Sequence, residues 1–226
     1  MKKKFIKSFL ILLILISESF ANDVNNENSD LYQVKIILIE HNFSNNLAYN
    51  KSHVNEKFFD NDSIKINSNN CLINKDQSCV KYEKDYKLET FKEYIKAIEA
   101  DNNIKIITHL EWIQNFNDIL NVKIKSGYDY SEEIINEDID LIDIDIIGLG
   151  KITKYEGYIN ITKNKFFKIN LNLLERMKMK SLGFFEKDIL VSKKYKISQK
   201  IKLNKTTYID RDNFGLIIKI EKIKDF

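Results

Sequence analysis

The spacing of hydrophobic and polar residues predicts a protein built mainly of β-strands. Residues 31–41 (LYQVKIILIEH) are rich in β-branched side chains and hold a long apolar run, so we expect a strand that is buried on much of both faces. Six later segments have strand-like alternation or short apolar runs: 104–114, 120–125, 152–162, 166–173, 195–203 and 216–223. Short polar stretches at 163–165 and 210–213 predict turns between neighbouring strands.

One segment has the spacing of a helix instead. Leu88, Phe91, Tyr94, Ile95 and Ile98 follow the spacing i, i+3, i+6, i+7 and i+10. This spacing predicts an amphipathic helix over roughly 86–101. A single helix among closely spaced strands predicts an α+β fold, mainly an antiparallel β-sheet with one clear amphipathic helix.

Two polar regions interrupt these patterns. Residues 22–30 (NDVNNENSD) are typical of a linker, and residues 42–83 form an Asn-rich excursion that we expect to be irregular, with a short element near 63–66. Strand-like segments follow one another through the rest of the chain, and the sequence has no internal repeat. We therefore expect residues 31–226 to form a single domain that includes the 42–83 excursion.

The first 21 residues have the pattern of an export signal. Three lysines follow Met1, an eight-residue apolar core spans 9–16, and Ser19-Phe20-Ala21 is a small-x-small cleavage site. The core is shorter than the roughly 20 residues that span a bilayer, although an uncleaved anchor is the alternative. We expect cleavage after Ala21, release into the periplasm and no membrane span after cleavage.

The charge of the chain argues against a nucleic-acid partner. The 226 residues carry a formal net charge of +3. Four lysines and one glutamate within residues 1–21 account for all of it, so the remainder is formally neutral. A neutral domain lacks the general excess of basic residues that nucleic-acid-binding domains use.

The chain has two cysteines, Cys71 and Cys79, which lie close together in the excursion. Because exported proteins reach an oxidising compartment, a disulfide between them is the favoured state, and two free thiols are the alternative. No C-x-x-C motif is present, and two cysteines alone do not make a zinc site.

Catalytic chemistry finds little support in the sequence. His109 and Glu111 lie two apart on a predicted strand and therefore share a face, with Trp112 on the other. Such a pair is a possible proton-transfer unit, but a structural hydrogen bond is the commoner role. No nucleophile motif, phosphate loop or metal-ligand spacing occurs, so we expect no enzyme, no cofactor and no metal. The acidic segment 136–147 favours a solvated face, with calcium binding as the alternative.

Four segments in order resemble one protein family. They are LYQVKIILIEH (31–41), IITHLEWIQ (106–114), YEGYINITKNKFFKINLNL (155–173) and SQKIKLNKTTYIDRDNFGLIIKI (198–220). The matching positions are Tyr32, Glu40, His41, His109, Trp112, Gln114, Gly157, Phe166, Tyr208, Asp210, Phe214 and Gly215. Lys200 and Lys202 stand where the family has arginines. Together these segments resemble the CsiV family of periplasmic peptidoglycan-binding proteins.

This resemblance implies a non-enzymatic periplasmic protein that binds peptidoglycan and supports cell-wall synthesis and cell shape. It also implies a link to the outer-membrane lipoprotein LpoA and, through it, to a class A penicillin-binding protein. A periplasmic adaptor that binds only proteins and touches no glycan is the alternative. A third interpretation is that the protein is a wall hydrolase. Such an enzyme would release muropeptides, and we expect no detectable release.

The chemistry of the polymer selects candidate binding residues. Aromatic rings pack on sugar faces and lysines complement the carboxylates of the peptides, although core packing is the commoner fate of an aromatic side chain. The candidates are Trp112, His109, Gln114, Tyr32, Tyr158, Tyr208, Asp210, Lys200 and Lys202, with Tyr155 as a further aromatic.

Overall fold

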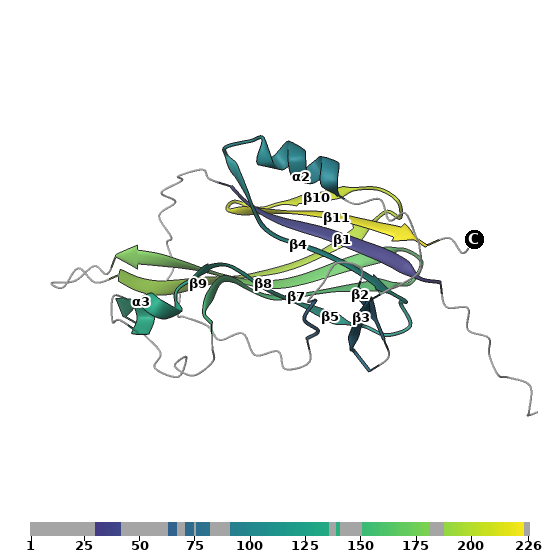
Figure 1. Cartoon of the computed structure of the whole chain (residues 1–226), viewed down its shortest axis with the longest axis horizontal. Coiled ribbons are helices and arrows are strands. Elements are labelled where there is room, and N and C mark those ends of the chain that lie inside the picture. Colours follow the sequence, from purple (N-terminus) through teal and green to yellow (C-terminus); the bar gives the residue numbers. More distant parts are fainter. Residues whose placement is uncertain are drawn as a thin grey trace, which may run out of the picture. The chain divides into compact units, whose positions relative to one another are not determined.

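Most of the described chain lies in two β-sheets (Figure 1). The structure is a computed structural model, and it describes residues 30–41, 63–66, 71–74, 76–81, 91–135, 139–140, 151–180 and 188–223. Leu31–Phe226 forms one compact unit. The predicted export signal, the cleavage site and the linker up to residue 29 lie outside the described residues. No described helix is long and apolar enough to span a membrane.

The first sheet, sheet A, has the strand order β10-β11-β1-β4-β2-β3. Its strands are β1 (Tyr32–His41), β2 (Cys71–Ile73), β3 (Cys79–Lys81), β4 (Ile104–Gln114), β10 (Thr207–Asp210) and β11 (Phe214–Lys222). The central strand β1 pairs antiparallel with β11 on one side and with β4 on the other. The strand predicted over 31–41 is therefore confirmed, and it is buried along most of its length on both faces.

The second sheet, sheet B, has the order β5-β7-β8-β9-β6. Its strands are β5 (Asn121–Asp129), β6 (Ile139–Asp140), β7 (Thr153–Lys163), β8 (Phe167–Lys180) and β9 (Asp188–Ile201). The β5, β7, β8 and β9 strands are antiparallel neighbours, whereas β6 adds to β9 in parallel. The expected α+β fold, mainly antiparallel, is thus confirmed.

The two sheets pack face to face, and one face of each sheet is buried in the core between them. Val34, Ile36 and Leu38 of β1 belong to the same buried cluster as Ile159 of β7 and Leu171 of β8. Successive strand residues point to opposite faces, so alternate positions fill this core and the positions between them face outward. Each sheet therefore has one inner face, which packs against the other sheet, and one outer face.

Two helices lie on the outer faces (Figure 1). The α2 helix (Lys92–Glu99) follows the buried Phe91, which packs with Ile37 and Ile39 on the outer face of sheet A. The helix predicted over 86–101 is confirmed for this described part, and residues 82–90 lie outside it. The short α3 helix (Ser131–Ile135) was not predicted, and it packs beside Tyr130 and Leu190.

Several strand bounds differ from the prediction. The β8 strand continues to Lys180 and β9 begins at Asp188, well beyond the predicted segments. Charged residues such as Glu175, Arg176 and Lys178 break the apolar pattern there, yet the strand pairing continues through them. The predicted turn at 163–165 is confirmed, with the amide of Asn164 donating to the carbonyl of Phe166 at 3.2 Å.

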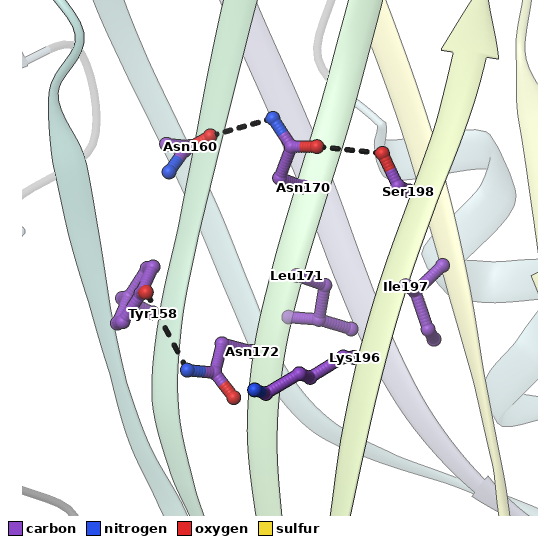
Figure 2. A pocket seen from close by; sticks show the side chains of 8 residues that line it. All are labelled: Tyr158, Asn160, Asn170, Leu171, Asn172, Lys196, Ile197 and Ser198. Carbon is purple, nitrogen blue, oxygen red and sulfur yellow. Dashed lines mark hydrogen bonds between the residues drawn. The ribbon is translucent and has the colours of Figure 1, made fainter.

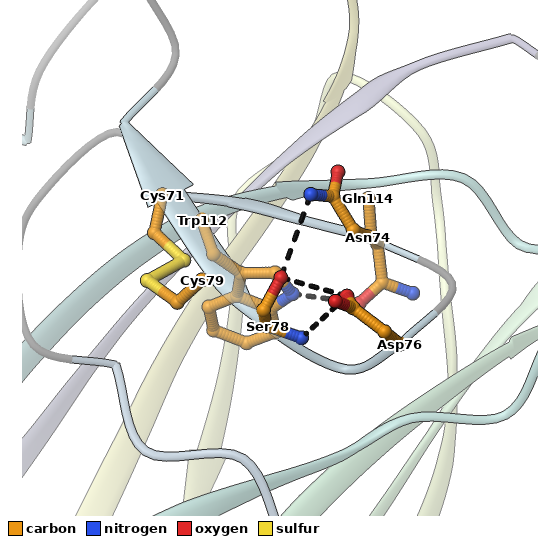
Figure 3. Close-up of a disulfide and its surroundings, with 7 residues drawn as sticks. All are labelled: Cys71, Asn74, Asp76, Ser78, Cys79, Trp112 and Gln114. Atoms are coloured by element: carbon orange, nitrogen blue, oxygen red, sulfur yellow. Dashed lines mark hydrogen bonds between the residues drawn. A yellow bond between two sulfur atoms is a disulfide. The ribbon is translucent and has the colours of Figure 1, made fainter.

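The predicted disulfide between Cys71 and Cys79 is present (Figure 3). It joins the β2–β3 hairpin, where Ile73 pairs with Cys79. Cys71 pairs with Trp112 of β4, so the hairpin extends sheet A at its edge. This part of the excursion is therefore ordered strand, contrary to the expectation of irregular structure. The chain-entropy model assigns a loop of this size about 2–3 kcal/mol of stabilisation.

Candidate functional site

Three of the predicted binding residues are buried in the core. Trp112 is 1% exposed, and its indole Nε1 donates to Oε1 of Gln114 at 2.6 Å, as Figure 3 shows. Gln114 is itself 1% exposed. Tyr32 is buried between Phe116 and Phe167 and accepts a hydrogen bond from Nζ of Lys163 at 2.6 Å. In this conformation none of the three offers a ring or an amide to a large polymer.

His109 and Glu111 form the pair that their spacing predicts. His109 Nε2 lies 2.8 Å from Oε1 of Glu111, and the Glu111 side chain is only 2% exposed. Both side chains lie on the outer face of sheet A, opposite Trp112, which belongs to the core between the sheets. The ring of Phe91 lies beside His109. The histidine thus provides a hydrogen-bond partner for the buried carboxylate of Glu111, which is a structural role.

On the outer face of sheet A, charged side chains form ion pairs with one another. Lys35, which is 1% exposed, donates to Oε2 of Glu221 at 2.6 Å, and Lys219 lies 2.6 Å from the other carboxylate oxygen. Burial raises the pKa of Glu221, but the hydrogen bonds from Lys219 and Lys35 outweigh it and hold that pKa below its usual value. Lys35 also lies over the ring of Phe91. This part of the face thus presents few unmatched charges to a ligand.

Two of the predicted residues meet at the β10 end of sheet A. The hydroxyl of Tyr208 donates to Oδ1 of Asp210 at 2.9 Å, and Nε2 of His41 lies 3.1 Å from the same oxygen. The hydrogen bond from Tyr208, together with that from His41, lowers the pKa of Asp210. A Cβ at Gly215 would lie 2.5 Å from the Tyr208 ring, so the ring packs directly over the glycine. This contact explains why Tyr208, Asp210 and Gly215 belong to one motif.

Phe214, the other residue of that motif, has a different role. It is fully buried, with its ring 4.9 Å from that of Tyr195 and perpendicular to it. Beside it, the buried carboxylate of Glu175 accepts hydrogen bonds from the hydroxyls of Tyr195 and Tyr155, at 2.8 and 3.3 Å, and from the amide of Asn213. This network joins sheet B to the β10–β11 turn, so it is a structural connection between the sheets.

The outer face of sheet B carries an open row of amides (Figure 2). The Nδ2 of Asn160 donates to Asn121 at 3.0 Å, the Nδ2 of Asn170 donates to Asn160 at 2.9 Å, and the hydroxyl of Ser198 donates to Asn170 at 2.7 Å. These four residues face one another in the register of β5, β7, β8 and β9. The strand pairing therefore places the hydrogen-bonding side chains in one line across the sheet.

The next row along the strands adds an aromatic ring and a charge. Tyr158 of β7 is opposite Asn172 of β8, whose Nδ2 lies 3.4 Å from the tyrosine hydroxyl, and Asn172 is opposite Lys196 of β9. The Oδ1 of Asn172 is buried without a hydrogen-bond partner among the described residues. Together the two rows line a groove of about 330 Å³. Figure 2 shows the Lys196 side chain extending along the surface beside Asn172.

Lysines flank these rows. Lys123 pairs with Tyr158 in the register, Lys168 pairs with Lys200, and the ammonium of Lys200 lies 4.1 Å from the centre of the exposed Phe166 ring. Lys202 is exposed just after β9. We call the following set the amide–lysine face: Tyr158, Asn160, Asn170, Asn172, Lys196 and Ser198, with the flanking Lys123, Lys168 and Lys200. Toward α3 the same sheet face closes, since Leu174 and Arg176 are buried.

The sequence predicted some residues of this face and its surroundings, but not the asparagines that line the groove. Tyr158, Lys200 and Lys202 were candidates, whereas Asn160, Asn170 and Asn172 were not. A signal for them exists in the sequence, because these asparagines alternate with buried Ile and Leu residues on both sides of a predicted hairpin. Pairing the two strands around 163–165 places Asn160 opposite Asn170.

The described residues hold no group of three or more His, Cys, Asp or Glu side chains that could bind a metal ion. Most of the acidic segment 136–147 lies outside the described residues, so the calcium alternative is not addressed by them. The amide–lysine face offers hydrogen-bond donors, acceptors and positive charge. These groups can bind a polar ligand that carries negative charge.

Comparisons with known proteins give one result. No curated protein and no solved structure matches the chain significantly. A family model does match, and its description is "Peptidoglycan-binding protein, CsiV". The match covers residues 7–223, which includes both sheets and the amide–lysine face. A family of this description indicates a protein of the cell envelope. The chain belongs to the CsiV family of peptidoglycan-binding proteins.

Proposed function

We propose that this protein is a non-enzymatic, periplasmic protein that binds peptidoglycan through the amide–lysine face. The observation that carries the proposal is the open polar surface on sheet B in a chain whose family is described as peptidoglycan-binding. Peptidoglycan presents N-acetyl groups, peptide bonds and carboxylates. Asparagine side chains both donate to and accept from amides, and lysines pair with carboxylates.

The contrast among the predicted residues supports this location. Trp112, Gln114 and Tyr32 are in the core, whereas Tyr158 and Lys200 lie on the outer face of sheet B. Tyr208 and Asp210 are exposed but bond to each other and to His41. The amide–lysine face therefore presents outward-facing amides and lysines around a groove that can receive a ligand.

The proposed cellular role is support of cell-wall synthesis and cell shape. The family resemblance suggests a link to LpoA and, through it, to a class A penicillin-binding protein, by a surface other than the amide–lysine face. A purified mixture of this protein with LpoA tests the link. Co-elution in size-exclusion chromatography is the expected result, and separate elution at micromolar concentrations of both proteins would remove it from the proposal.

Co-sedimentation with purified sacculi tests the wall binding itself. The protein as exported, residues 22–226, is incubated with sacculi at about 0.15 M and about 1 M salt, where the Debye lengths are about 8 and 3 Å. We expect retention in the pellet at both salts, with less at the higher salt because the lysines contribute. An unrelated neutral periplasmic protein is the control.

Two outcomes would overturn the proposal. Absence of retention at both salts would favour the adaptor that binds only proteins. Release of soluble muropeptides from the sacculi during the incubation would show a hydrolase instead, and chromatography of the supernatant detects it.

A further inference from the structure

We infer that the amide–lysine face recognises the peptide stems of peptidoglycan and not the faces of its sugars. This inference rests on the proposed function and names the part of the polymer that is bound. It follows from the amides and lysines that this face presents and from the absence of an open aromatic ring in its described groove.

Packing against a sugar face is typically made by an exposed aromatic ring that can lie flat against it. Trp112, Tyr32 and Tyr155 are at most 3% exposed and belong to the core. On the amide–lysine face the ring of Tyr158 is half-buried, and its hydroxyl already contacts Asn172. The exposed ring of Phe166 beside this face has the ammonium of Lys200 4.1 Å from its centre. The groove itself therefore has no open aromatic platform among its described residues.

The amide row matches peptide bonds instead. Each side-chain amide has two N–H donors and an oxygen with two lone pairs. Within the row, Asn160 and Asn170 each use one donor and one acceptor position on their neighbours. Each keeps a second donor and a second acceptor position for a ligand. A peptide group offers one N–H and one C=O, so it can bond to the same side chain in both directions.

The lysines supply the complement to carboxylates, which the peptide stems carry. None of the ion pairs between described residues includes Lys123, Lys168 or Lys196. Lys168 stands two residues from Asn170 on the same face of β8, and Lys196 is opposite Asn172. Each amide row therefore has a lysine whose backbone position lies about 7 Å away along a strand or one strand spacing away. Over its entire length after residue 21 the chain is neutral, so this cluster is a local excess.

The test compares intact sacculi with glycan strands from which an N-acetylmuramoyl-L-alanine amidase has removed the peptides. Both polymers carry the same sugars, and only the first carries peptide stems. We expect the protein to bind intact sacculi and to lose at least about tenfold in affinity for the peptide-free strands, which corresponds to about 1.4 kcal/mol. Equal binding to both polymers would overturn the inference while the proposed function stands. Binding to neither polymer would overturn both.

A pair of matched variants locates the contact. The double variant Lys168→Gln and Lys196→Gln removes two charges from the amide–lysine face. The control Lys92→Gln and Lys96→Gln removes two charges from α2, which lies on the outer face of sheet A. We expect about tenfold weaker binding to sacculi for the first variant and unchanged binding for the second, at equal thermal stability. Equal effects of the two variants would show non-specific attraction and overturn the inference.

Discussion

The outer faces of the two sheets both carry polar and charged side chains, but those side chains have different partners. On sheet A, the charges of Lys35 and Glu111 are nearly fully buried, and each has a partner of opposite charge or a histidine at hydrogen-bond distance. Phe91 and α2 cover the neighbouring apolar positions. On sheet B, Asn170 and Lys196 point outward into a groove. The outer face of sheet A pairs its charges within the chain, whereas the amide–lysine face of sheet B presents its polar groups to the surroundings.

This difference shows why a polar strand face does not by itself identify a binding surface. Buried charges stabilise a fold only when their partners are in place, and removal of one partner is costly. Exposed lysines contribute little to folding, so their concentration on one face has no stabilising purpose in the isolated protein. The comparison therefore predicts that substitutions on sheet A change stability and that substitutions on the amide–lysine face change binding.

The largest effect is expected from Gly157→Ala in β7. A Cβ at this position would collide with the backbone oxygen of Asn172 and lie 2.9 Å from the Cα of Leu173. Because these are backbone atoms of the adjacent strand, the sheet must shift, and we expect a loss of about 3 kcal/mol. Urea denaturation measures it. Gly215→Ala is the control on sheet A, since the three atoms nearest its Cβ belong to the Tyr208 side chain, which can move. Equal losses in the two variants would contradict the close strand contact.

Loss of the disulfide is the next largest effect. The double variant Cys71→Ser and Cys79→Ser should lower the free energy of unfolding by about 2–3 kcal/mol, because the unfolded chain regains the freedom of the closed loop. The β2–β3 hairpin belongs to sheet A, so binding to sacculi at 25 °C should not change. A large loss of binding in a variant that remains folded by circular dichroism would place the hairpin in the ligand site.

Glu221→Gln tests the closed charges of sheet A through their pH dependence. The variant should lose about 2 kcal/mol at pH 7, because the carboxylate that neutralises Lys35 is gone. The pKa of Glu221 is lowered in the folded protein, so its stabilising contribution is present above the unfolded value of 4.5 and is lost as the pH falls through the lower folded value. The difference between parent and variant should therefore shrink below pH 4.5. Denaturation midpoints at several pH values measure it, and a constant difference would refute the assignment.

The smallest effect is expected from Tyr208→Phe at the β10 edge. The hydroxyl of Tyr208 lowers the pKa of Asp210, so its removal should raise that pKa toward the ordinary value of 3.8. Stability should change by less than about 0.5 kcal/mol, because Asp210 is largely exposed. A carboxyl titration followed by NMR gives the pKa. An unchanged pKa would mean that His41 alone holds the carboxylate.

The sequence predicted the strands whose alternation is regular, and it failed where charges occupy strand positions. The predicted strand that ended at residue 173 continues through Glu175, because two tyrosines from neighbouring strands and Asn213 satisfy that buried carboxylate. These partners are distant in the sequence, so no local pattern could reveal them. The same limitation applies to Trp112: both faces of its strand are covered, so alternation alone could not separate a core tryptophan from an exposed one.

The candidate surface was predicted in part for a related reason. The net charge argued only against a nucleic-acid partner, and neutrality of the chain after residue 21 is compatible with lysines gathered on one sheet face. The amides at Asn160, Asn170 and Asn172 have no individual signal, and their alignment arises only when β7 and β8 pair. The predicted turn at 163–165 implies this register, so pairing the two predicted strands around it is the step that locates the asparagines.

An NMR titration of the ¹⁵N-labelled protein with soluble disaccharide-peptides from digested peptidoglycan tests the central claim most directly. The account predicts that the perturbed backbone amides cluster at 158–160, 168–172 and 196–200, on the outer face of sheet B. Perturbations confined to α2 and the outer face of sheet A, or no perturbation at millimolar ligand, would contradict it.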